Sequence, residues 1–122
     1  MIWAAVLTLA SYHVGADPGR FNRVNPGLGI ERTAGARSIG VGVYQNSEWR
    51  VSTYAVLGYE RGGRVSFGVQ VGIATGYRWP VLPIVAPYVR VKFGAGFSVR
   101  ILALPARRPI LGAQLVRSLG RR

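Results

Sequence analysis

Residues 64–77 read RVSFGVQVGIATGY, and this stretch decides the fold. The odd positions from Val65 to Ile73 carry bulky apolar side chains, whereas the even positions from Ser66 to Gly76 carry only Ser, Gly, Gln or Ala. A strict period of two is typical of a β-strand, here with one apolar face and one face of small residues. Such small residues indicate either a close backbone approach or open volume behind the strand. We therefore predict a strand over 64–77 whose two faces differ in kind.

The same alternation recurs along the chain and predicts eight strands joined mostly by short turns. They cover residues 3–14, 27–33, 38–44, 49–59, 64–77, 88–93, 96–104 and 110–119. Consecutive strands with glycine-rich or polar turns favour an antiparallel meander, and eight strands is the smallest common closed barrel. The predicted fold is all-β, an eight-stranded antiparallel up-and-down β-barrel; a two-sheet sandwich is the alternative. Residues 1–122 form one domain, in which 105–122 supply a basic turn, the last strand and an arginine-rich tail.

The apolar face has two possible environments. An outer-membrane barrel turns apolar residues outward and small or polar ones inward, and the alternation fits this arrangement. The apolar bands are shorter than the roughly 9–11 residues usual for a spanning strand. A soluble barrel whose outside is covered by a partner predicts the same pattern. Both environments place the glycine-rich face inside, where Glu31 and Arg100 are predicted to point and where a buried charge needs a partner.

Composition limits the possible partners and chemistry. The 122 residues carry a formal net charge of +12, from 16 basic residues, all but one of them arginine, and four acidic ones. A basic chain attracts polyanions: nucleic acid, a phosphorylated lipid or an acidic protein face. Without cysteine, disulfide scaffolds and thiolate metal sites are excluded. The four acids show no ligand spacing, so neither a metal nor another cofactor is predicted.

Residues 1–10 are apolar and resemble the core of a signal peptide. They have no Lys or Arg ahead of the apolar run and only a poor cleavage site. We interpret them as the start of the first strand, because Ala4 and Val6 alternate with Trp3, Ala5 and Leu7.

A proline-punctuated run, WPVLPIVAP at 79–87, precedes the sixth predicted strand. Proline cannot donate to a β-ladder, so it weakens strand pairing wherever it lies within a sheet. The run therefore predicts either an ordinary long loop or a soft seam in the barrel wall.

Taken in order, several segments resemble the lipid A palmitoyltransferases of Gram-negative outer membranes (the PagP type) and their small phage and bacterial relatives. The likeness covers residues 11–105. The matching pieces are SYH at 11–13, RFNRVNPGLG at 20–29, YQNS at 44–47, YAVLGYE at 54–60 and PVLPIVAP at 80–87.

The resemblance implies a barrel in the outer membrane or cell envelope that moves a palmitoyl chain from a phospholipid to lipid A. It implies catalytic roles for His13, Asn46 and Ser47, and a lipid gate at Pro80, Pro83 and Pro87. Asn46 stands where the family has Asp. An amide can hydrogen-bond an imidazole but cannot stabilise its positive charge, which weakens the case for acyl transfer.

Two function classes follow. The first is a PagP-like barrel that handles lipid acyl chains, with or without acyltransferase activity, and that has an elongated apolar interior pocket reachable beside Pro83 or Pro87. The second is a non-enzymatic, basic structural or decoration protein of a phage particle. Its partners would be neighbouring capsid or tail subunits and nucleic acid, and its location the virion. This class predicts a filled interior and an apolar outer face covered by those subunits.

Overall fold

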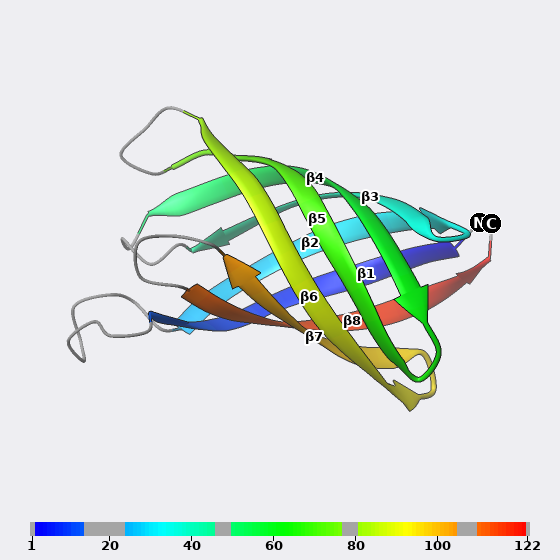
Figure 1. Ribbon diagram of the computed structural model, residues 1–122. Coiled ribbons are helices and arrows are strands. Elements are labelled where there is room, and N and C mark those ends of the chain that lie inside the picture. The colour runs from blue at the N-terminus through cyan, green and yellow to red at the C-terminus, as the bar shows by residue number, and fades with distance from the viewer. Residues whose placement is uncertain (1, 14–23, 46–49, 77–80, 105–109, 122) are drawn as a thin grey trace.

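The computed structural model describes residues 2–13, 24–45, 50–76, 81–104 and 110–121, without the side chains of 11–13, 24–25 and 120–121. Eight strands form one closed barrel in chain order, each antiparallel to its neighbours (Figure 1). They are β1 (Ile2–His13), β2 (Val24–Ala34), β3 (Arg37–Gln45), β4 (Val51–Gly62), β5 (Val65–Ala74), β6 (Leu82–Gly94), β7 (Phe97–Leu104) and β8 (Ile110–Arg121). The predicted eight-stranded barrel is confirmed, and the sandwich alternative is wrong.

Strand β8 closes the barrel by pairing with β1 from Ile2↔Arg121 to His13↔Ile110. Each strand therefore has a paired neighbour on both sides. In the described ranges, no helix is long and apolar enough to cross a membrane.

The two ends of the barrel differ. Both chain termini lie at one end (Figure 1), together with the tight connections β2–β3, β4–β5 and β6–β7, and we call it the turn end. Glycine is needed in these turns, because Gly35 and Gly96 have φ of 60° and 80°. The opposite, loop end carries the other four connections, most of whose residues lie outside the described ranges.

Burial follows the predicted alternation. Along β5, Val65, Phe67 and Val71 are exposed, while Ser66 and Gln70 are buried. The bulky face therefore points outward and the small face lines the interior, as predicted for both a membrane barrel and a barrel covered by a partner. Apolar interior contacts form where β1 and β8 meet, with Val6 and Val116 both fully buried.

Strand boundaries differ most from prediction around the prolines. The sixth strand begins at Leu82 and not at residue 88, so that Pro83 and Pro87 lie within β6. They are tolerated because β5 pairs with them in unbroken register, as Ile73↔Pro83 and Val69↔Pro87. The second strand also starts earlier than predicted, at Val24.

Candidate functional site

A buried ion pair lies inside the barrel, in the half toward the turn end. Arg100 and Glu31 are 1% and 3% exposed, and Arg100 Nη2 donates to Glu31 Oε1 at 2.5 Å. Arg100 Nη2 and Nε also donate to Gln114 Oε1 at 2.6 and 2.9 Å, and Gln114 Nε2 donates to Thr8 Oγ1 at 3.4 Å. The predicted inward pair is confirmed, and it joins β2, β7, β8 and β1 across the lumen.

A second charged group lies beside it, nearer the turn end. Arg90 Nε lies 3.0 Å from Glu60 Oε1, and Arg90 Nη2 lies 4.0 Å from Glu31 Oε2. Tyr88 donates its hydroxyl proton to Glu60 Oε1 at 2.6 Å, and its ring centroid lies 5.3 Å from the Arg100 guanidinium carbon. Both inward-facing carboxylates are therefore paired with guanidinium groups.

The small interior face allows tyrosine rings to lie flat against the wall. A Cβ added at Gly42 would come within 2.6 Å of the Tyr54 ring, and one at Gly68 would come within 2.5 Å of the Tyr88 ring. Neither glycine can be replaced without moving an inward-facing tyrosine. The sequence predicted either a close backbone approach or open volume behind the small residues. At Gly42 and Gly68 there is a close approach, but the approaching group is an aromatic side chain.

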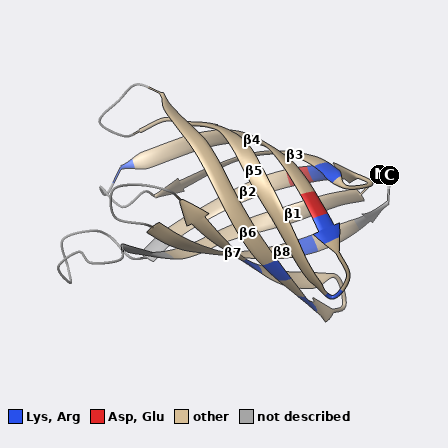
Figure 2. Ribbon diagram, in the orientation of Figure 1, with Lys and Arg blue, Asp and Glu red and all other residues tan. Residues whose placement is uncertain are grey.

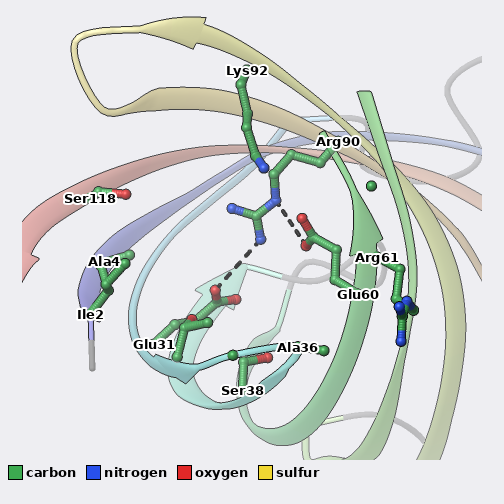
Figure 3. A pocket seen from close by; sticks show the side chains of 13 residues that line it. Ile2, Ala4, Glu31, Ala36, Ser38, Glu60, Arg61, Arg90, Lys92 and Ser118 are labelled. Carbon is green, nitrogen blue, oxygen red and sulfur yellow. Dashed lines mark ion pairs between the residues drawn. The ribbon is translucent and has the colours of Figure 1, made fainter. Parts of the chain in front are cut away.

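A cavity of about 540 Å³ opens into the lumen at the turn end, lined in part by Glu31, Glu60, Arg90 and Lys92. Figure 3 shows Arg90 reaching between the two carboxylates, with Lys92 above it. Arg61 also lines it, and a lining with five ionisable side chains suits water or a polar solute far better than an acyl chain.

The wall is incompletely paired beside the prolines. Among the described residues, the β6–β7 ladder ends at Tyr88↔Leu102, whereas β5 pairs with β6 as far as Leu82. The Lys92 N–H donates to Arg64 on the β5 side. Because successive N–H groups of a strand alternate in direction, Pro83 and Pro87 lack the donors that would face β7. The interior beside this seam is apolar, with Ala86 and Leu102 buried and Ile84 and Leu104 packed on them.

The predicted site residues are only partly placed. His13 ends β1 opposite Ile110, at the loop end, and its side chain lies outside the described atoms. Asn46, Ser47 and Pro80 lie outside the described residues. Pro83 and Pro87 are exposed on the outer face of β6. The structure thus places two of the three proposed gate residues on one outward stripe and leaves the proposed catalytic group a prediction.

Sequence analysis missed Arg90, Glu60, Tyr88 and Gln114 as members of the interior network. The available signal was their position along the strands: Glu60, Tyr88 and Arg90 lie at alternate positions from the outward-facing Tyr59, Pro87 and Val91. Within the described ranges, no group of His, Cys, Asp and Glu could hold a metal ion.

No protein-family model matches the chain, and no curated protein matches it either. Among solved structures, the chain is similar to the de novo designed TMB2.3, solved by solution NMR. The TM-score is 0.75 at 10% sequence identity, over 98% of this chain and 95% of the design. At this identity the likeness shows the fold alone.

Proposed function

We propose that this chain is a membrane-embedded β-barrel whose eight strands cross a lipid bilayer. The observation that carries the proposal is an apolar belt around the outside. Every strand contributes at least one large, exposed apolar side chain to it: Leu7, Leu28, Val41, Leu57, Val71, Val85, Ile101 and Leu111. A continuous apolar surface of this kind is unfavourable in water and matches the acyl-chain region of a bilayer.

The interior supports the same conclusion. Glu31, Gln70, Ser66 and Arg100 are buried while large aliphatic side chains are exposed, the reverse of a water-soluble barrel. The interior carboxylates pair with guanidinium groups, and the paired strands satisfy their backbone groups without water. Outward positions of the belt carry no charged side chain in the described ranges, so crossing the bilayer would bury no unpaired charge.

The test compares one substitution at two depths of β5. Val71 lies in the middle of the belt, opposite Leu57 and Val85, whereas Val65 lies at the turn end. In lipid vesicles, Val71→Arg should lower the free energy of unfolding by about 2–4 kcal/mol, and Val65→Arg by about 1 kcal/mol or less. Folding is followed by gel mobility without heating and by circular dichroism during urea unfolding.

Two results would contradict the proposal. One is equal destabilisation by the two arginines in vesicles. The other is a wild-type chain that folds in detergent-free buffer as a soluble oligomer and does not enter vesicles. That second result would favour an outer face covered by neighbouring subunits, as in a decoration protein of a phage particle.

The seam beside Pro87 favours a second candidate, the handling of a lipid acyl chain. The missing β6–β7 pairing and the apolar residues behind it, Ala86 and Leu102, support lateral entry of such a chain. In a palmitoyl transfer, the ester bond to the phospholipid breaks as an ester bond to a lipid A hydroxyl forms. The hydroxyl proton passes to the released lysophospholipid, with His13 as the proposed base and Asn46 and Ser47 beside it.

This second candidate is tested with a phospholipid carrying a radiolabelled palmitoyl chain and with lipid A, in mixed micelles. We expect labelled lipid A from the wild-type chain, less from Pro87→Ala and none from His13→Ala, with Arg50→Gln as a surface control. Absence of label transfer by folded wild-type protein would remove the acyltransferase proposal and leave the membrane barrel intact.

A further inference from the structure

Four outward-facing arginines near the turn end each lie directly opposite an aromatic residue of the neighbouring strand. The cross-strand pairs are Trp3↔Arg32, Arg37↔Tyr59, Arg61↔Phe67 and Arg117↔Phe97. We call these eight residues the turn-end girdle; they come from seven of the eight strands. The repeated pairing of one cation with one aromatic ring distinguishes this rim from the rest of the outer face.

The side chains in the girdle contact one another. The Arg32 and Arg117 guanidinium carbons lie 5.4 and 4.7 Å from the ring centroids of Trp3 and Phe97. Arg61 Nη1 donates to the Tyr59 hydroxyl oxygen at 3.1 Å. A guanidinium that stacks on an aromatic ring keeps its full positive charge, which attracts an anion.

Among the described residues, no acidic side chain points to the outer face beside the girdle. The two acidic residues of the described ranges, Glu31 and Glu60, point into the lumen and pair there with Arg100 and Arg90. Figure 2 shows most basic residues of the drawn strands gathered toward the end that carries the termini. Within the described ranges, the charged side chains on the outer rim at this end are therefore all arginines.

We propose that the turn-end girdle binds the phosphate groups of anionic lipids, so that the turn end lies in the leaflet richer in those lipids. This inference rests on the proposed function. Aromatic rings favour the membrane–water interface, and arginine stems extend along them toward the headgroups. The girdle borders the apolar belt directly, so a lipid whose acyl chains lie on the belt brings its phosphate to the arginines.

The test uses Trp3 as a reporter inside the girdle. A Trp49→Phe, Trp79→Phe variant keeps Trp3 as the single tryptophan and is refolded into phosphatidylcholine vesicles. Either phosphatidylcholine or phosphatidylglycerol with brominated acyl chains is then added at equal mole fraction, and quenching of Trp3 emission gives the relative occupancy beside it. One basic residue near an anionic surface corresponds to a preference of about fivefold for phosphatidylglycerol.

We expect Arg32→Gln to reduce this preference to near one, and raised salt to weaken it. Arg50→Gln is the matched control, because Arg50 is exposed at the opposite end of the barrel, and it should leave the preference unchanged. Equal quenching by the two lipids, or a preference that survives Arg32→Gln, would overturn the inference while leaving the membrane barrel in place. Absence of quenching by either lipid would overturn both.

Discussion

Replacing Glu31 with Gln removes the acidic partner of a guanidinium that has almost no contact with solvent. Arg100 would keep Gln114 Oε1 at 2.6 and 2.9 Å, but its charge would lose the carboxylate now 2.5 Å away. Arg100 Nη1 is already buried without a hydrogen-bond partner among the described residues. Removing one partner of a buried pair costs about 3–5 kcal/mol, and the two remaining bonds to Gln114 place our expectation near 3 kcal/mol.

The opposite substitution should cost less. In Arg100→Met, Glu31 keeps a second cation, since Arg90 Nη2 lies 4.0 Å from its Oε2. The Glu31→Gln, Arg100→Met double variant leaves no unpaired charge at these two positions. Because a buried pair can often be exchanged for apolar or neutral groups at little cost, the double variant should be more stable than Glu31→Gln alone by about 2 kcal/mol.

Stability is measured by urea unfolding in detergent micelles, followed by circular dichroism and extrapolated linearly to zero denaturant. A cost below about 1 kcal/mol for Glu31→Gln would show that water solvates the pair as it does a surface salt bridge. If the double variant is no more stable than Glu31→Gln, the unpaired charge of Arg100 is not the cause of the lost stability. Either result would refute the account of the interior as a closed polar network.

Two further predictions concern the tyrosines of the interior. Gly42→Ala forces a methyl group against the Tyr54 ring and should lower the free energy of unfolding by about 1–3 kcal/mol. Gly63→Ala, where nothing lies within 4 Å, should change it by less than about 0.5 kcal/mol; equal effects in urea unfolding would contradict the packing argument. Tyr88→Phe removes a hydrogen bond to the Glu60 carboxylate and should cost about 1.5–3 kcal/mol. The Tyr88→Phe, Glu60→Gln double variant should show a coupling energy between the two sites, and strictly additive losses would count against the bond.

Sequence alone predicted the barrel because the alternation in 64–77 is nearly perfect. The outward position of the bulky apolar residues was predicted from the difference in residue size between the two faces. The sequence also predicted that Glu31 and Arg100 share the interior, since both occupy inward positions of their strands. They are 69 residues apart, and parity alone could not show that they touch. That contact depends on how far each strand is staggered against the next around the barrel, which local patterns do not encode.

The prolines show a different limit. Proline at 83 and 87 suggested a loop or a weak seam, because a ladder donor is missing at each position. The structure places both residues in β6 with full pairing to β5, since the missing donors face the other neighbour. Which side of a strand a missing N–H faces depends on the strand's pairing register, and the sequence does not reveal it. The aromatic partners of the arginines were missed for the same reason.

Pairing of Ile2 with Arg121 has a consequence for how the molecule assembles. Strand β8 pairs with β1, so the barrel cannot close until residues 110–121 have been synthesised. Contacts between residues so far apart in the sequence form late and slow folding. Until then, β1 and β8 each expose a row of unsatisfied amide and carbonyl groups, which other chains could capture. Correct assembly therefore requires that β1 and β8 pair with each other before either strand pairs with another copy of the chain.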